Sequence, residues 1–309
     1  MDDFFRTLPK AELHLHLEGA IDAGMIRELD PAIPEDEVSR RFAIADFAGF
    51  IEAFKWVVGF LRTPDDYALV TRRLLERLER DNVRYAEITL AAGVILWRGQ
   101  EFAPIYDAIT REAAKSSVDV WWVLDVIRHF GPEPAATVAR WAVERAGDRV
   151  VAFGIGGDEA RGPAGQFREV FEFTRAHGLK AVPHAGETTN AQSVWDAIEI
   201  GADRIGHGIR AIEDPRLVAH LVERRIPLEV CVTSNLVTGA VRSLEEHPVR
   251  RLWETGVPII LNSDDPGLFG ATVSGEYRLA EERLGFSRDE LRRMAAESFE
   301  HGFRSRAIL

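Results

Sequence analysis

The sequence predicts an α/β protein whose fold is a (β/α)₈ TIM barrel with extra helices after the first strand. Eight short apolar runs support this prediction, because parallel strands covered by helices read as near-continuous hydrophobic segments. Segments of helical periodicity alternate with these runs, which implies a parallel sheet with helical crossovers. With 309 residues and no linker-like stretch, the chain is expected to form one barrel domain over residues 1–309.

The first strand is expected within residues 9–19, where two histidines stand two positions apart in an apolar run. Side chains of a strand alternate between its faces, so His14 and His16 should share one face while the leucines beside them occupy the other. Two imidazoles on one face can chelate a metal ion, although two hydrogen-bonded core histidines would give the same local pattern. The rest of the chain must decide between these interpretations.

Residues 20–80 are expected to be mostly helical, with leucines at helical spacing over 65–80. Prolines at positions 31, 34 and 64 divide the region into short segments, because proline removes a backbone donor and clashes with the preceding turn. The region is long for one crossover, so its extra helices are expected to cover one end of a site. We expect its phenylalanines to pack between helices rather than to line an entrance: Phe42, Phe47, Phe50, Phe54 and Phe60.

The remaining strands are expected from residue 83 onward, where apolar runs and amphipathic segments alternate regularly. The intervening helices include 135–144 and 191–200. An open, doubly wound sheet is the alternative, but no GxGxxG motif follows the first strand. The expected strands are 83–90, 118–127, 150–155, 179–184, 204–207, 226–232 and 257–262.

Composition and charge exclude several classes of protein. Hydrophobic residues make up 46% and charged residues 28%, as in globular proteins, and no apolar run reaches the roughly 20 residues that span a bilayer. The acidic start lacks the basic region of a signal peptide, so a cytoplasmic location is expected. A net charge of −12 argues against nucleic acid as a partner and favours a small, neutral or cationic substrate. Cys231 is the only cysteine, which excludes intrachain disulfides and two-cysteine zinc sites.

Polar residues stand where predicted strands end, and in a barrel the functional groups come from these carboxyl ends. Because the carboxyl ends of parallel strands meet at one mouth, residues distant in sequence should converge there. Chance does not readily put three histidine-bearing motifs and a carboxylate pair at matching strand ends, which favours an active site over a purely structural role. The segments are 14–16, 156–159, 184–187, 204–208, 233–235 and 262–266.

A divalent metal ion would suit these residue types. His14, His16, a further histidine and an aspartate would supply nitrogen and oxygen ligands and leave one position for water, as catalytic zinc requires. Zinc lowers the pKa of bound water from about 15.7 to about 7 and so provides hydroxide at neutral pH. A carboxylic acid and an imidazole beside the ion would move the protons, and Glu187 and His207 are the candidates.

Five motifs are specific in combination. They are residues 11–20 (AELHLHLEGA), 157–159 (GDE), 184–187 (HAGE), 204–208 (RIGHG) and 262–266 (NSDDP). The HxH pair alone is shared with many metal-dependent hydrolases, whereas HAGE, GHG and the tandem aspartate before proline are highly specific together. By these motifs, which extend over nearly the whole chain, the sequence resembles the adenosine deaminase family of the amidohydrolase superfamily.

The resemblance implies one zinc ion per chain, held by His14, His16, His184 and Asp264. It also counts Asp264 among the catalytic residues and puts His16 beside the substrate. A hydrolase of the same superfamily with two metal ions would usually carry a carboxylated lysine at the end of the fourth strand. The run 150–156 contains no lysine, so a single ion is expected.

The resemblance also implies which groups contact a purine. Glu187 would protonate N1 so that C6 becomes electrophilic, and His207 would orient and deprotonate the attacking water. Asp265 would be the acceptor facing N7, the backbone N–H of Gly157 would donate to N3, and Glu18 would lie next to a ribose. A glutamate must be protonated to act as an acid, and burial in a pocket would favour this by raising its pKa.

The expected substrate is a 6-aminopurine compound, in the first place an adenosine-type nucleoside that is hydrolysed to an inosine-type product and ammonia. Glu18 stands where many adenosine-specific members carry aspartate, whereas glutamate is familiar in adenine deaminases and aminodeoxyfutalosine deaminases. Both activities are therefore alternatives. A catalytically inactive purine-binding barrel is a remote one, and deaminases with cysteine-ligated zinc are excluded by the single cysteine.

Overall fold

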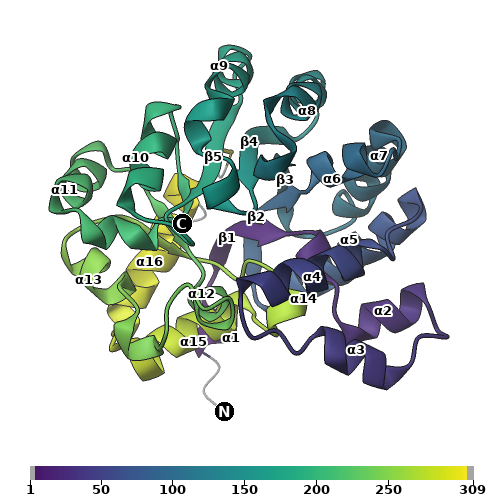
Figure 1. Cartoon of the computed structure of the whole chain (residues 1–309). Coiled ribbons are helices and arrows are strands. Elements are labelled where there is room, and N and C mark those ends of the chain that lie inside the picture. Colours follow the sequence, from purple (N-terminus) through teal and green to yellow (C-terminus); the bar gives the residue numbers. More distant parts are fainter. Residues whose placement is uncertain (1–3, 305–309) are drawn as a thin grey trace.

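The computed structural model describes residues 4–304, and its strands form one eight-stranded sheet in the order of the sequence. Each strand pairs in parallel with the next. The segment after the last strand meets the first strand at a bridge between Leu15 and Asp264, so the sheet is a nearly closed barrel, as predicted (Figure 1). The strands are β1 (Lys10–His16), β2 (Val83–Leu90), β3 (Asp119–Ile127), β4 (Val150–Gly156), β5 (Lys180–Ala185), β6 (Ile205–His207), β7 (Leu228–Val230) and β8 (Ile259–Leu261).

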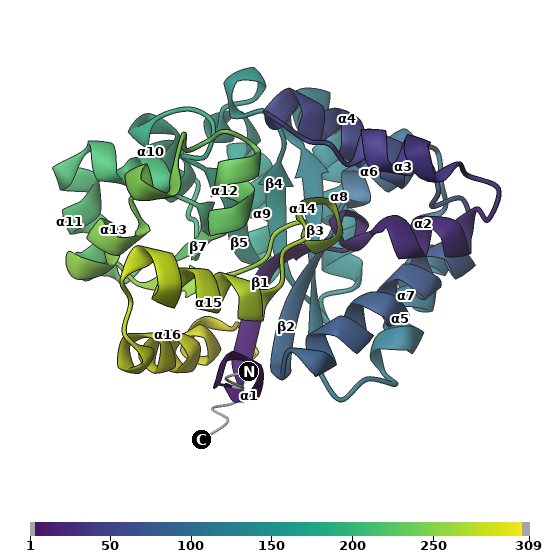
Figure 2. The ribbon, with the colours of Figure 1, turned by 90° about the horizontal axis from the view of Figure 1, so that it is seen from below.

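Helices surround the barrel, and several stand between β1 and β2, where extra helices were predicted. Those helices are α2 (Ala23–Leu29), α3 (Glu35–Arg41), α4 (Phe47–Val58) and α5 (Pro64–Arg80). Figure 2 shows α3 and α4 beyond one end of the strands, whereas α1 (Phe4–Thr7) lies at the other end. The helices after β2 are α6 (Ala92–Trp97), α7 (Phe102–Ala113), α8 (Pro132–Glu144), α9 (Arg168–Ala176), α10 (Ala191–Glu199), α11 (Pro215–Arg224), α12 (Val232–Val237), α13 (Val249–Glu254), α14 (Pro266–Phe269), α15 (Val273–Leu284) and α16 (Arg288–His301).

Local signals explain where α4 and α5 begin. The Asp46 side chain accepts a hydrogen bond from the Gly49 N–H and caps α4. Thr63 and Asp66 form a capping box at the start of α5, and Pro64 occupies its first turn, where a missing N–H costs nothing. These caps fix the position of α4 in the sequence and therefore which of its residues reach the barrel mouth. Within residues 4–304, no helix combines the length and the apolar content needed to cross a bilayer.

Strand β1 departs from strict alternation. The N–H groups of the consecutive residues Leu13 and His14 both donate to Asn262 Oδ1, at 2.8 and 3.1 Å, and the register with β2 shifts here. As a result Leu13 packs in a small cluster apart from the main core that contains the next leucines. The prediction that the leucines share one face was therefore wrong for Leu13, although His14 and His16 do lie together.

Strands β7 and β8 are shorter than the predicted runs 226–232 and 257–262. Neighbouring residues such as Cys231 and Val257 are buried without belonging to a strand. An apolar run reports burial, and it therefore overestimates the length of a strand that continues into a buried loop.

A buried ionic network lies just before β6. Arg204 donates to Glu87 and to Glu229, each at 2.5 Å, and the Phe303 ring lies 3.8 Å from its guanidinium carbon. All three charged side chains are almost completely buried. One cation between two carboxylates leaves a net negative charge, and the Glu229 carboxylate also contacts His14, which belongs to the site.

Candidate active site

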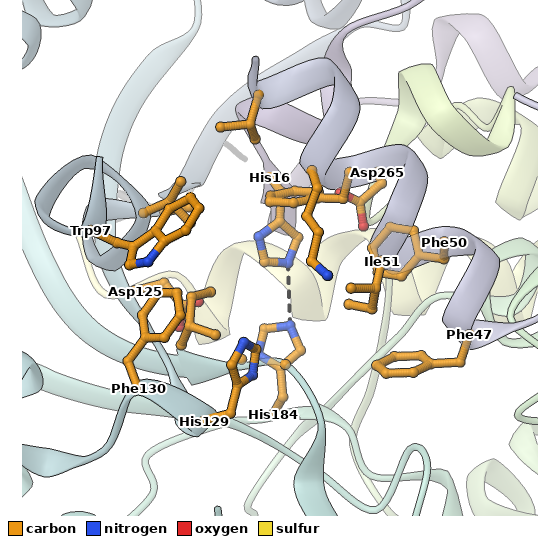
Figure 3. Close-up of a pocket in the computed structure, with 18 of the residues that line it drawn as sticks. His16, Phe47, Phe50, Ile51, Trp97, Asp125, His129, Phe130, His184 and Asp265 are labelled. Carbon is orange, nitrogen blue, oxygen red and sulfur yellow. Dashed lines mark hydrogen bonds between the residues drawn. The ribbon is translucent and has the colours of Figure 1, made fainter. Parts of the chain in front are cut away.

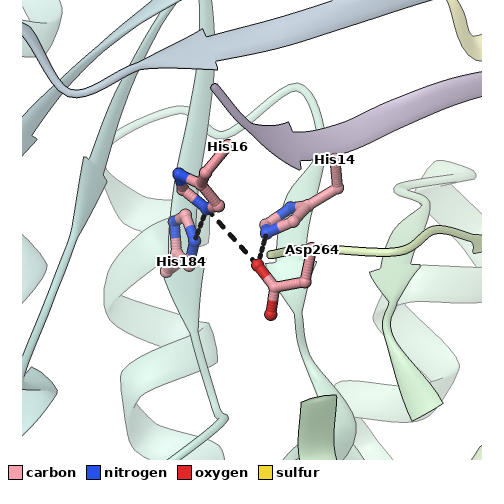
Figure 4. A group of neighbouring side chains, drawn as sticks. All are labelled: His14, His16, His184 and Asp264. Atoms are coloured by element: carbon pink, nitrogen blue, oxygen red, sulfur yellow. Dashed lines mark hydrogen bonds and ion pairs between the residues drawn. The ribbon is translucent and has the colours of Figure 1, made fainter. Parts of the chain in front are cut away.

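Four side chains with ligand atoms for a metal converge in the barrel (Figure 4). His14 and His16 come from β1, His184 comes from β5, and Asp264 follows β8. Their ligand atoms all lie within 4.8 Å of one another. His16 Nε2 is 3.2 Å from His184 Nε2, and Asp264 Oδ1 lies 3.3 Å from His14 Nε2 and 3.4 Å from His16 Nε2.

The contacts behind this cluster fit a bound cation. His14 Nδ1 lies 2.8 Å from Glu229 Oε2 and His184 Nδ1 lies 3.1 Å from the Ile155 carbonyl, so each ring can donate from Nδ1 and offer Nε2 to a metal ion. His14 Nε2 is buried, and the group that faces it is the Asp264 carboxylate of the same cluster. Imidazole nitrogens and a carboxylate oxygen are ligands of zinc and related divalent ions. The four residues therefore fit a metal ion, and they are the four that the family resemblance implied as ligands.

His207 and Glu187 stand beside the cluster. His207 ends β6, and its Nε2 lies 3.8 Å from Glu187 Oε2 and 3.8 Å from Asp264 Oδ2. His207 and Asp264 have φ values of 60° and 64°, a left-handed conformation that costs a residue with a Cβ about 1 kcal/mol or more. Burial raises the pKa of Glu187 well above its usual value, and the Asp264 carboxylate adds to the shift. This environment favours the protonated acid.

Glu159, for which we predicted no role, holds the turn that carries Glu187. Its carboxylate accepts the N–H groups of three consecutive residues, Gly186, Glu187 and Thr188, each at 2.8 Å. Burial alone would raise the pKa of Glu159, but the hydrogen bonds, led by that of Ser193, lower it. An ionised carboxylate therefore fixes the backbone on which Glu187 stands. The signal in the sequence was the third residue of the GDE motif.

The remaining predicted substrate contacts have different surroundings. Asp265 is buried, its Oδ1 has no hydrogen-bond partner among the described residues, and a Cβ on Gly19 would lie 1.7 Å from that oxygen. Gly157 lines the cavity with φ +88°, a conformation that favours glycine. Glu18 is buried, and its carboxylate accepts the Ala91 N–H at 3.1 and 3.2 Å. Among the described residues, Glu18 is not one of those that line the cavity.

A cavity of about 350 Å³ leads from the cluster towards α4 (Figure 3). Its walls are mostly apolar, and Trp97, which is 70% exposed, stacks on Phe130 at 5.9 Å. The prediction that the phenylalanines of α4 only pack between helices was wrong, because three of them line this cavity. The apolar lining residues include Phe47, Phe50, Ile51, Phe54, Val58, Val94, Trp97, Ile127 and Phe130.

Four polar lining residues were missed in the sequence: Lys55, Arg98, Asp125 and His129. Asp125 in β3 is buried, its Oδ1 has no hydrogen-bond partner among the described residues, and burial raises its pKa to about 8. His129 and Lys55 also line the cavity, and burial lowers the pKa of His129. An aspartate within the apolar run 118–127 was a usable signal. Lys55 gave none, because a lysine on an amphipathic helix is ordinary.

Comparison with known proteins agrees with this geometry. Residues 9–307 match the family model described as Adenosine deaminase. An aminodeoxyfutalosine deaminase of Streptomyces coelicolor is 41% identical over 97% of this chain and 81% of its own length. An adenine deaminase of Rhizobium leguminosarum bv. trifolii is 35% identical over 96% of this chain and 95% of its own.

Solved structures show the same likeness. An adenine deaminase from Arthrobacter aurescens superimposes with a TM-score of 0.91 at 28% identity, over 97% of this chain and 95% of its own. An amidohydrolase from Burkholderia ambifaria, solved with bound zinc, has a TM-score of 0.90 at 26% identity, over 97% and 87%. With the barrel and the His/Asp cluster described above, these likenesses show that the chain is a metal-dependent hydrolytic deaminase and belongs to the adenosine deaminase family.

Proposed function

We propose that the chain is a zinc-dependent deaminase of a 6-aminopurine nucleoside with a large N9 substituent, and that aminodeoxyfutalosine is its substrate. In the reaction the oxygen of water bonds to C6, the C6–N6 bond breaks, and ammonia leaves as the 6-oxo purine forms. The observation that carries the proposal is the aromatic cavity beyond the His/Asp cluster, because free adenine would leave this outer part without a partner. The 41% identity to an aminodeoxyfutalosine deaminase supports it.

The ion would be held by His14, His16, His184 and Asp264. When bound, zinc would lower the pKa of water and so supply the nucleophile at neutral pH. The donor set and the zinc in a structural neighbour support this choice of metal.

The chain's own residues would then act on the purine. Buried Glu187 would donate its proton to N1, which makes C6 electrophilic, and His207 would orient the attacking water. Asp265 and the Gly157 N–H would bind N7 and N3 at the ring edges. Burial raises the pKa of Asp265 well above its usual value, so its protonated carboxyl group could donate a hydrogen bond to the N7 lone pair instead of accepting one.

The outer cavity suits an aromatic group with a negative charge. Trp97 and Phe130 offer ring faces, and an exposed large aromatic side chain is typical of a surface that binds an apolar partner. Lys55 lies in the same wall and pairs with Glu52 at 2.8 Å, but both side chains are exposed, so this pair contributes little and can exchange. Aminodeoxyfutalosine, whose sugar carries a carboxyphenyl group, matches this combination. Lys55 would supply a local positive charge for this carboxylate, although the net charge of −12 led us to expect a neutral or cationic substrate.

Asp125 would bind the sugar. Its carboxyl group is buried in the cavity wall, and Oδ1 has no protein partner among the described residues. A ribose hydroxyl could both donate to and accept from this group, and an unsatisfied buried polar atom costs free energy until such a partner arrives.

The test is ammonia release from aminodeoxyfutalosine, adenosine and adenine by the zinc-loaded enzyme. We expect kcat/KM for aminodeoxyfutalosine to exceed that for either other purine by at least about tenfold, which corresponds to about 1.4 kcal/mol. Preference for adenosine or for adenine would contradict the proposed substrate and support the corresponding alternative. No turnover of any of the three would contradict the proposed reaction.

A pair of lysine variants tests the outer cavity. Lys55→Ala should raise KM for aminodeoxyfutalosine and leave adenosine turnover unchanged. Lys115→Ala is the matched control, because Lys115 pairs with Glu112 at 2.6 Å with the same spacing in sequence and is not among the lining residues. Equal effects of Lys55→Ala on both substrates would contradict the carboxylate contact. The single domain and the cytoplasmic location stay predictions.

A further inference from the structure

Asn235 and His247 form a buried chain of hydrogen bonds that ends on His207. Asn235 Nδ2 lies 3.2 Å from His207 Nδ1, and His247 Nε2 lies 3.2 Å from Asn235 Oδ1. We propose that Asn235 and His247 are positioning residues, which hold His207 in the tautomer with its proton on Nε2. This inference deepens the proposed function and rests on it for the identity of the reaction.

A backbone N–H determines which atoms donate and which accept in this series of hydrogen bonds. The Val249 N–H, which can only donate, lies 3.2 Å from His247 Nδ1, so this nitrogen must accept. Burial lowers the pKa of His247 to about 4, with the neighbouring His207 adding to the shift, so the ring is neutral and its proton is on Nε2. That N–H donates to Asn235 Oδ1, which fixes the orientation of the amide. The amide nitrogen must then face His207 and donate to Nδ1.

The opposite direction of these hydrogen bonds, with a proton on His207 Nδ1, would leave a conflict at the Val249 N–H. A proton on His207 Nδ1 would require Asn235 Oδ1 to accept it, and the rotated amide would donate to His247 Nε2. His247 would then carry its proton on Nδ1, against the Val249 N–H at 3.2 Å. Two donors would meet without an acceptor, and His207, Asn235 and His247 are all at most 4% exposed, so water does not readily resolve the conflict.

The tautomer of His207 affects the reaction because its Nε2 faces the attacking water. This nitrogen lies 3.8 Å from both Glu187 Oε2 and Asp264 Oδ2, on the side of the ring that faces the cluster. In the Nε2–H tautomer it donates a hydrogen bond to the attacking water oxygen and leaves that oxygen a lone pair for C6. Nε2 has no lone pair with which to take a proton, so His207 orients the water instead of deprotonating it.

The first test reads the tautomer directly, without substrate. Two-bond ¹H–¹⁵N correlations of zinc-loaded protein with ¹⁵N-labelled histidine distinguish the two tautomers, and His207→Gln assigns the signal. We expect the proton of neutral His207 on Nε2. In Asn235→Asp the carboxylate accepts but does not donate, so the proton should move to Nδ1. A wild-type ring protonated on Nδ1, or the same tautomer in both proteins, would overturn the inference.

The second test is kinetic. Asn235→Asp should lower kcat by about 100-fold or more with little change in KM, since a wrong histidine tautomer in a catalytic triad costs about 10⁴-fold. His247→Phe removes the donor to Asn235 and should give a smaller loss of kcat, and it serves if Asn235→Asp does not fold. Thr238→Val is the control, because its buried hydroxyl donates to the Ser234 carbonyl of the same segment. Unchanged kcat in both variants would overturn the role.

Zinc content is measured for every variant, so that a lost ion is not mistaken for a wrong tautomer. If the wild-type enzyme turns over none of the purines, the proposed function fails, and the NMR result still decides the chain of hydrogen bonds.

Discussion

Glu187 and Glu229 are both buried carboxyl groups, yet their surroundings shift them in opposite directions. Burial would raise the pKa of both. For Glu229 this is outweighed by the charge of Arg204 and by the hydrogen bond to His14, so its pKa is lowered. For Glu187 the Asp264 carboxylate adds to the effect of burial, and its pKa is raised. One carboxylate can thus hold a metal-binding imidazole while the other serves as an acid.

Glu187→Gln should keep the metal and lose most of kcat. The amide keeps the shape of the acid but has no acidic proton to give to N1, and general acid catalysis contributes about 10²–10⁴-fold. Ammonia release and metal content, measured on the same sample, check this. Near-wild-type turnover would remove Glu187 as the acid.

Glu229→Gln should weaken metal binding by about 10- to 100-fold, because Glu229 orients His14 through a 2.8 Å contact with Nδ1. Competition with a chelator measures the affinity. Glu87→Gln is the matched control, since Glu87 pairs with the same Arg204 and is not a hydrogen-bond partner of His14. Equal losses of affinity in both variants would show that the network acts through stability and not through His14.

Among the elements, the short turn η1 (Glu18–Ala20) packs against α14, and two glycines permit this contact. A Cβ on Gly19 would lie 1.7 Å from Asp265 Oδ1, and a Cβ on Gly267 would lie 2.4 Å from the carbonyls of Ala20 and Ile21. The two segments therefore approach each other only where no side chain intervenes. Their contact determines where the Asp265 carboxylate can stand.

Gly19→Ala should displace Asp265 and lower kcat/KM, while the metal ligands stay in place. A misplacement of about 1 Å can cost about 100-fold, so a loss of at least tenfold is expected. Steady-state kinetics and metal content check the variant. Gly147→Ala is the control, because no heavy atom lies within 4 Å of its added Cβ. Wild-type kinetics in Gly19→Ala would mean that Asp265 does not contact the substrate.

The sequence predicted individual elements unevenly. The histidine pairs and carboxylates at strand ends could be found because each motif is local. Asn235 was expected at the mouth as part of the segment 233–235, but its link to His247 and His207 could not be found, since it exists only after β6, α12 and the segment before α13 have packed together. The role of Glu229 was easier to predict from the sequence, because a glutamate in the middle of the buried run 226–232 needs a cation or a histidine nearby.

At the scale of the whole molecule, the barrel was predictable because strands and helices alternate along the chain and each connection is local. The cavity was not. Its shape depends on where α4 crosses the barrel mouth, and the phenylalanines of α4 have the same spacing whether they face another helix or a substrate. Amphipathic spacing says which face is apolar, and it does not say what that face covers.

Metal removal should lower the melting temperature of the whole protein, because the four ligands join β1, β5 and the segment after β8. Zinc at about 100 times its Kd should stabilise the fold by about 2.7 kcal/mol, which corresponds to several degrees in a chain of this length. Thermal unfolding of chelated and zinc-restored protein measures this. An unchanged melting temperature would mean that the cluster does not hold the ion tightly in the folded state.

The bridge between Leu15 and Asp264 joins two segments that the ribosome synthesises at very different times. The ribosome releases β1 first, but the strand segment that closes the barrel beside it is synthesised some 250 residues later, as the separation of 249 between Leu13 and Asn262 illustrates. No nascent chain that ends before residue 264 holds all four ligands. The four ligands can therefore come together only after Asp264 has been synthesised, and until closure the edge of β1 needs protection from pairing with other chains.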